Sequence, residues 1–247
     1  MIGNFSVLEG TISTSVEIMA KRPIFLYSDK PSSLLEKIEV EFKWHPGLAV
    51  SQKQKSVESL HNAAQEQLEL NNILEISSKS KVDLGVSLSA FNLSLTNKDN
   101  IKAPVEVFFQ GSKVFDQGGP FTDLYRKTSR EAKKDERLVE SGDLIEFHFD
   151  DQKWPLSPST MFYDWLYCSA LEQNLPQAEA LLDYDAFTDI EFNPDRSINC
   201  QAASAAIYAS LVKKDLITEA MKSCKNFIEI HERYSTGGTL IQDTLFN

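Results

Sequence analysis

Three polar residues near the middle of the chain, Glu106, Gln110 and Lys113, have the types and spacing of a catalytic group. At about 100° per residue, a helix would place Glu106 and Lys113 roughly 20° apart around its axis, with Gln110 on the same side. A carboxylate can act as a general acid or base, and a partly desolvated lysine can become a neutral amine nucleophile toward a carbonyl or masked aldehyde. The same spacing also describes the solvated face of an ordinary surface helix, so spacing alone leaves both interpretations open.

The helix expected to position these residues begins after Pro104, because proline is common at helix starts, and is broken by the GGP sequence at residues 118–120. Phe108 and Phe115 are expected on the opposite face, where they would anchor the helix in the core. Phe109 flanks the polar side and could form the wall of a pocket. The surrounding elements must therefore leave room for a ligand on one side of this helix.

Those elements can be predicted from the alternation and periodicity of apolar residues. Residues 23–28 and 38–44 alternate as half-buried strands that are expected to pair, and residues 144–150 are a third strand candidate. A helix is expected over residues 51–70. Further helices are expected at residues 120–125, 128–139, 159–172, 177–182, 200–212 and 218–230. The predicted fold class is therefore α+β and predominantly helical, with a small N-terminal β component.

The predicted organisation is an extension over residues 1–18, a β-hairpin and helix region over 19–70, a catalytic domain over 71–232 and a tail over 233–247. The 247 residues, 42% of them hydrophobic, can bury a substantial core. No apolar run approaches the roughly 20 residues of a membrane span, and no leader pattern is present, so a cytoplasmic protein without a membrane partner is expected.

Charge and cysteine content narrow the classes of function. A formal net charge of -11 argues against a protein that coats DNA non-specifically, although a local basic groove could still hold a few phosphates. The three cysteines are widely spaced, which suggests neither a disulfide framework nor a structural zinc site. The four histidines are scattered, so no metal and no other cofactor is expected.

A second polar cluster lies at residues 189–199. Asn199 is a candidate contact for a ribose or phosphate, and Glu191 is a weaker second carboxylate candidate. The alternative is purely structural, with an Asx turn at Asn193 and a helix cap formed by Ser197 or Asn199.

Two further candidate contacts come from local chemistry. Gly118 and Gly119 lead into a predicted helix N-terminus, whose free backbone amides attract phosphates, although a plain turn is the alternative. Trp154, which precedes a proline, is the aromatic residue best suited to stack on a purine base. The aromatic residues of the following helix are expected to belong to the core.

The pattern E-x-x-F-Q-x-x-K, formed by Glu106, Phe109, Gln110 and Lys113, resembles the core motif of the NADAR family. Bacterial YbiA-like members of that family cleave N-glycosidic bonds to ribose phosphates. The resemblance implies a YbiA/NADAR-like domain in which these residues contact the substrate.

The preceding sequence LSAFNL, residues 88–93, is similar to the short Leu-Ser-Asn-Phe segment of the same family. This similarity implies ligand contacts from Ser89, Phe91 and Asn92. Ala90 stands where the family segment has asparagine. The sequence therefore leaves open which backbone or side-chain amide group of this segment contacts the ligand.

Several longer strings between about residues 19 and 211, among them FFQGSKVFDQGGPFTDLY and AFTDIEFNPDRSINCQA, look like the NADAR antitoxins paired with DarT-type toxins. Such toxins attach ADP-ribose to guanine in DNA. The resemblance implies that the substrate is ADP-ribosylated guanine in DNA, that ADP-ribose is the product ligand, and that a cognate DarT-type toxin is a partner.

The residues agree with a defined chemistry for that reaction. Lys113 would attack the masked aldehyde of the opened ribose and form a Schiff base, while Glu106 would protonate the departing amine and activate water. Two alternatives are a hydrolase of a small N-ribosyl metabolite and a non-catalytic antitoxin that neutralises its toxin by binding it.

Overall fold

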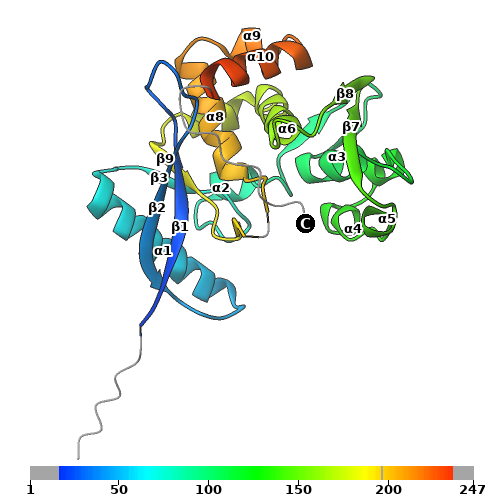
Figure 1. Ribbon diagram of the computed structural model, residues 1–247. Coiled ribbons are helices and arrows are strands. Elements are labelled where there is room, and N and C mark those ends of the chain that lie inside the picture. Colours follow the sequence, from blue (N-terminus) through cyan, green and yellow to red (C-terminus); the bar gives the residue numbers. More distant parts are fainter. Residues whose placement is uncertain (1–16, 196, 236–247) are drawn as a thin grey trace, which may run out of the picture.

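The computed structural model describes residues 17–195 and 197–235, and its N-terminal part is a long β-hairpin packed on a helix (Figure 1). Strands β1 (Ile18–Leu26) and β2 (Glu36–Trp44) pair antiparallel along their whole lengths, which confirms the predicted pairing. Helix α1 (Val50–Leu68) covers the hairpin, also as predicted. Its apolar stripe of Val57, Leu60 and Ala64 is buried against Val40 and Phe42 of the hairpin.

The sheet is completed by two short strands from distant parts of the sequence. Strands β3 (Ile73–Glu75) and β9 (Ala186–Thr188) join it in the order β2-β1-β9-β3. Strands β3 and β9 are parallel, with Glu75 opposite Thr188. Because the carboxyl ends of parallel strands meet at the same edge of a sheet, this pairing brings Glu75 next to Asp189.

The middle of the chain forms a second region of short helices and two small sheets, β4-β5 and β6-β7-β8. Its elements, in chain order, are α2 (Asp83–Ser87), β4 (Ser94–Thr96), β5 (Lys102–Pro104), α3 (Val105–Gly111), β6 (Lys113–Phe115), the 3-10 helix η1 (Thr122–Arg126), α4 (Ser129–Lys133), α5 (Arg137–Glu140), β7 (Leu144–Phe149) and β8 (Gln152–Trp154).

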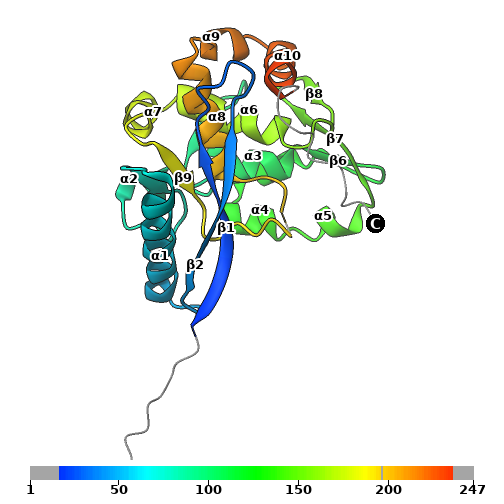
Figure 2. The ribbon, with the colours of Figure 1, turned by 60° about the vertical axis from the view of Figure 1, so that its left-hand side comes forward.

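The C-terminal part is helical and lies between and above these two regions (Figures 1 and 2). It consists of α6 (Met161–Glu172), α7 (Leu175–Leu181), α8 (Gln201–Lys213), α9 (Ile217–Ala220) and α10 (Cys224–Ser235). Helix α8 is buried on nearly every side, and its alanines allow it to pack closely against α6. The predicted fold class, α+β with a predominance of helix, is confirmed.

Three predicted helices are interrupted in the structure. Residues 128–139 form α4 and α5, and residues 218–230 fall in α9 and α10. The helix expected after Pro104 ends at Gly111, and the chain then enters strand β6. In each case a helix is present near the predicted start, but the local break that ends it was not visible in the sequence pattern.

The ends of the chain lie largely outside the described residues. Residues 1–16 of the predicted extension and residues 236–247 of the predicted tail are not described. Strand β1 begins at Ile18 and α10 continues to Ser235. In the described part of the chain, no helix is long and apolar enough to cross a membrane.

Candidate active site

A cavity of about 770 Å³ opens between the α3–α4 region, strand β7 and the segments around residues 155–163 and 189–201. It brings together many of the residues singled out in the sequence. These are Phe91, Glu106, Phe109, Gln110, Lys113, Glu191 and Asn199. Residues up to 108 positions apart in the sequence, Phe91 and Asn199, therefore line the same cavity, as a substrate site requires.

Glu106 lies on α3, which begins after Pro104 as predicted and is buried along its whole length. The side chain of Gln110 donates a hydrogen bond of 3.0 Å to the Glu106 carboxylate, one helical turn away. The ammonium group of Lys133, on α4, lies 3.2 Å from the same Glu106 oxygen. Because Glu106 is only 5% exposed and Gln110 only 6%, the interpretation of this stripe as a solvated helix face is wrong.

Lys113 reaches the same cavity from a strand and not from the helix. It is the first residue of β6 and pairs with Phe147 of β7. Its Nζ lies 5.0 Å from the centre of the Phe109 ring. The pKa of Lys113 is lowered to about 8, chiefly by burial; the charge of Glu106 opposes this shift, and the positive charge of Lys133 adds to it.

The break between α3 and β6 has a steric cause. The Tyr125 ring approaches Gly111 so closely that an added Cβ would lie 2.6 Å from it, and Ser112 Oγ hydrogen-bonds Tyr125 Oη at 2.9 Å. The amide of His148 then binds the Ser112 carbonyl at 2.8 Å and starts the β6–β7 pairing. Tertiary contacts thus turn the chain out of the helix just before Lys113.

Gly118 and Gly119 do not line the cavity. Gly119 has a φ of +94°, and a Cβ there would lie 2.3 Å from the Lys113 carbonyl oxygen. The following helix, η1, is a single short 3-10 segment. We therefore assign these glycines to close backbone packing behind Lys113 and leave them out of the proposed phosphate contacts.

The segment around Ala90 contributes a different set of groups from the one expected. Phe91 lines the cavity and is 39% exposed, but Ser89 and Asn92 do not line it. Ser89 is buried, and Asn92 donates to the Val86 carbonyl at 2.8 Å, so both hold the turn in shape. The Ala90 amide donates a hydrogen bond of 2.7 Å to the side-chain oxygen of Gln201.

Trp154 is fully buried and does not line the cavity. Its ring packs against Trp165 and Phe162 at centroid distances of 4.9 and 5.6 Å. In this position it has no surface for a base, and we leave it out of the proposed site. The aromatic wall of the cavity is formed instead by Phe109, Phe147, Phe162 and Tyr163.

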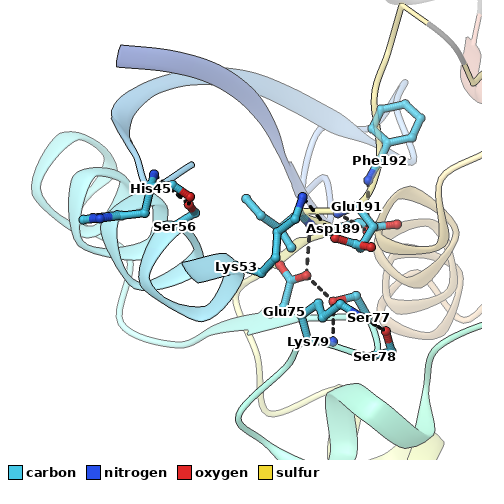
Figure 3. Close-up of polar contacts among 11 residues, drawn as sticks. His45, Lys53, Ser56, Glu75, Ser77, Ser78, Lys79, Asp189, Glu191 and Phe192 are labelled. Carbon is cyan, nitrogen blue, oxygen red and sulfur yellow. Dashed lines mark hydrogen bonds and ion pairs between the residues drawn. The ribbon is translucent and has the colours of Figure 1, made fainter. Parts of the chain in front are cut away.

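The buried carboxylates of Glu75 and Asp189 lie close together (Figure 3), and of the two only Asp189 lines the cavity. Glu75 accepts hydrogen bonds from Ser77 Oγ, Thr188 Oγ1 and the Ile190 amide at 2.6, 2.7 and 2.9 Å. Burial raises the pKa of both carboxyls, and the charge of Glu75 raises the pKa of Asp189 further.

Asp189 lines the cavity; it belongs to the polar cluster of residues 189–199 noted in the sequence, but it was not proposed there as a substrate contact. Its neighbour Glu191 lines the cavity as well and forms a 3.3 Å ion pair with Lys53 of α1, as Figure 3 shows. The position of Asp189 beside Glu75 could not be predicted, because it depends on the parallel pairing of two three-residue strands.

Asn199 and Ser197 both line the cavity, and neither caps α8. The cap residue of that helix is Cys200, which makes no side-chain capping bond. The capping alternative is therefore wrong, whereas the Asx turn is present, because Asn193 Oδ1 accepts from the Asp195 amide at 3.0 Å.

Gln201 and Lys133 are two more cavity residues that the sequence did not single out. Gln201 accepts from the Ala90 amide and donates to the Ile76 carbonyl, both at 2.7 Å, so it ties two cavity segments together. Lys133 places a positive charge beside Glu106. Among the described residues, no group of three or more His, Cys, Asp or Glu side chains is arranged to hold a metal ion.

Comparison with known proteins adds one finding. Residues 20–239 match the model of a family described as DarT1-associated NADAR antitoxin. No curated protein matches the chain. The matched range includes every cavity residue named above.

Proposed function

The chain belongs to the family of DarT1-associated NADAR antitoxins, and on that basis we propose that it is a glycohydrolase that removes ADP-ribose from guanine bases in DNA. The observation that carries this proposal is the lysine in the cavity. Lys113 has a pKa lowered to about 8 and lies near the buried carboxylate of Glu106. An amine that is partly neutral at physiological pH, beside a proton carrier, suits attack on an N-linked ribose.

The reaction begins with the opening of the ribose ring. The lone pair of the guanine amine forms a C=N bond to the anomeric carbon as the bond to the ring oxygen breaks, and that oxygen takes a proton from solvent. Neutral Lys113 then adds to the anomeric carbon. Ionised Glu106 takes the extra proton from the newly bonded lysine nitrogen and passes it to the guanine amine, which leaves, and a protonated Schiff base between Lys113 and the ribose remains.

Water completes the cycle. Glu106, ionised again, removes a proton from a water molecule that adds to the anomeric carbon and passes it to the lysine nitrogen, which leaves as the amine while the new hydroxyl group loses its proton to solvent. The resulting aldehyde recloses to the ribose of free ADP-ribose. Guanine is restored unchanged, and no oxidant, reductant or metal is consumed.

The aromatic wall and the polar groups that line the cavity fit such a substrate. Phe109 and Phe147, whose ring centres are 5.3 Å apart, offer a flat apolar surface to a purine ring. Asn199 supplies an amide that suits a ribose hydroxyl or phosphate oxygen. The family description associates these antitoxins with DarT1, and we propose this toxin as the source of the modified DNA.

Release of ADP-ribose from a guanine-ADP-ribosylated oligonucleotide tests the proposal. The protein should liberate ADP-ribose and restore the unmodified oligonucleotide. Activity restricted to small N-ribosyl metabolites would instead identify a YbiA-like metabolic hydrolase. Tight binding of the toxin without any release would identify an antitoxin that acts by sequestration.

The pH dependence of the rate should report the pKa of Lys113. With a pKa of about 8 and not 10.5, the neutral fraction of the amine at pH 7 rises from about 0.03% to roughly 10%, or about 300-fold. Because the neutral form is the nucleophile, kcat/KM should increase as the pH rises toward 8 and then level off. A rate that still rises tenfold per pH unit above pH 9 would contradict this.

Lys133→Met should move that profile to higher pH. Its charge lowers the pKa of Lys113, so its removal raises the pH at which half of Lys113 is neutral. Lys133→Arg keeps the charge and should leave the profile in place. A Lys133→Met profile that coincides with the wild-type profile would show that Lys133 does not tune Lys113.

Asn199→Ala should weaken binding of ADP-ribose, by roughly tenfold for one lost hydrogen bond, with little change in melting temperature. This expectation follows because Asn199 lines the cavity and does not cap α8. Calorimetric titration and thermal melting of the same variant check both parts. Unchanged affinity with a lowered melting temperature would assign Asn199 a structural role.

A further inference from the structure

Residues 126–134, which we call the basic segment, have a charge opposite to that of the chain as a whole. The segment contains Arg126, Lys127, Arg130, Lys133 and Lys134 but only one acid, Glu131, whereas the whole chain has a formal net charge of -11. It covers the end of η1 and all of α4. Such a concentration of charge could simply be solvated, so its surroundings decide what it can do.

The basic charge is poorly neutralised within the protein. Arg126, Lys127, Arg130 and Lys134 are exposed, and none of them forms an ion pair in the described part of the chain. Glu131 is occupied in a capping box, where its carboxylate accepts from the Thr128 amide and hydroxyl at 2.9 and 2.7 Å.

The nearest aspartates do not compensate these charges either. Asp123 and Asp135 are both bound by Arg137, at 2.8 and 2.7 Å. Lys127 is close enough to lower the pKa of Asp135 and Glu131, so it is the most compensated member. Arg126, Arg130 and Lys134 therefore remain available to an external anion.

The segment is fixed at the rim of the cavity. Ser129 Oγ donates a hydrogen bond of 3.1 Å to the Phe91 carbonyl, and this bond holds α4 against the cavity wall. Lys133 lines the cavity, and its Nζ lies 5.1 Å from the centre of the Phe91 ring. In Figure 1, α4 lies alongside α3, the helix that carries Glu106. A chain that leaves the cavity on this side would pass directly over the basic segment.

We propose that the basic segment is the docking surface for the phosphodiester backbone of the DNA strand that carries the modified base. The inference rests on the proposed function, because that function requires a base within a polymer to enter the cavity. An acidic protein repels DNA over most of its surface, so attraction must come from a local cationic cluster. Phe91, partly exposed between the segment and the cavity, can stack on a neighbouring base.

Two double variants with the same change in net charge distinguish docking at the basic segment from a general effect of net charge on DNA binding. In Arg130→Glu/Lys134→Glu the segment loses two cations, and Lys133 is left intact because it contacts Glu106. The matched control is Lys55→Glu/Lys102→Glu, which alters two exposed lysines that do not line the cavity and changes the net charge equally. Circular dichroism and thermal melting verify that both variants fold.

Anisotropy with a short unmodified single-stranded oligonucleotide measures docking without catalysis. The segment variant should bind at least about tenfold more weakly at low salt. The slope of log affinity against log salt concentration should become shallower by the equivalent of about one to two phosphate contacts. The control variant should lose much less. Equal losses in the two variants, or no binding by the wild type at low salt, would overturn the proposal.

Turnover distinguishes this inference from the proposed function itself. On an ADP-ribosylated oligonucleotide, kcat/KM of the segment variant should fall at least about tenfold, while its rate on an ADP-ribosylated guanosine nucleotide should equal that of the wild type. Equal falls on both substrates would overturn the docking role. If the wild type releases ADP-ribose from neither substrate, the glycohydrolase function fails, and the anisotropy result still decides whether the segment binds nucleic acid.

Discussion

Lys113→Ala is expected to abolish the release of ADP-ribose, with a loss in kcat of at least about 10³-fold. No other amine in the described part of the cavity can replace it, because Lys133 is engaged with Glu106 and mostly exposed. Alanine removes the nucleophile but leaves the β6–β7 pairing of residue 113 in place. Release of ADP-ribose in single-turnover assays measures the effect.

Lys113→Arg is the informative control for that variant. Arginine keeps the positive charge beside Glu106 but cannot become a neutral amine. It should therefore be as inactive as alanine while binding ADP-ribose more tightly than alanine does. Near-normal turnover by either variant would exclude a Schiff base at Lys113.

Lys113→Ala should lose activity without losing stability to unfolding at pH 7. The folded-state pKa of Lys113 is lowered, so folding opposes the charged form. This penalty is full below about pH 8 and disappears as the pH rises toward the ordinary value of 10.5. At pH 7, Lys113→Ala should therefore unfold at the wild-type temperature or above it.

Glu106→Gln is the second variant with a large expected effect, a fall of about 10²- to 10⁴-fold in kcat. Glutamine preserves the size of the side chain and can still bond with Gln110, but it carries no proton to the leaving amine and removes none from water. The charge of Glu106 also raises the pKa of Lys113. The residual activity should consequently show its pH midpoint at a lower pH than in the wild type.

Glu191→Gln is the matched control, since it neutralises another carboxylate that lines the same cavity. Glu191 forms an ion pair with Lys53, and it is not among the charged groups that shift the pKa of Lys113. Its substitution should leave kcat within a few-fold of the wild type. A comparable loss in both variants would mean that Glu106 has no special role in proton transfer.

Much of the fold could be predicted because it is encoded locally. The hairpin strands alternate in polarity, α1 has a regular apolar stripe, and both features survive in the structure. The break at Gly111 could not be predicted, because it depends on the Tyr125 ring and on pairing with β7. The helical geometry first suggested for Lys113 was thus wrong, although its position beside Glu106 was anticipated.

The candidate site divides in the same way. Glu106, Gln110 and Asn199 stand in motifs that could be recognised along the sequence. Lys133 could not be identified, because it resembles any exposed lysine of a surface helix. Asp189 stood in a polar cluster, but its position beside Glu75 depends on the parallel β3–β9 pairing. Trp154 was misjudged because a tryptophan before proline has the same local sequence in a core as at a binding surface.

Trapping of the intermediate is the decisive measurement. Protein turning over a guanine-ADP-ribosylated oligonucleotide is quenched with borohydride, digested and analysed by mass spectrometry. A reduced ADP-ribosyl adduct should be found on Lys113, should be absent from Lys113→Ala, and should accumulate in Glu106→Gln if Glu106 activates water. Continued release of ADP-ribose with an adduct on a different lysine, or with none on Lys113 in any variant, would contradict the mechanism.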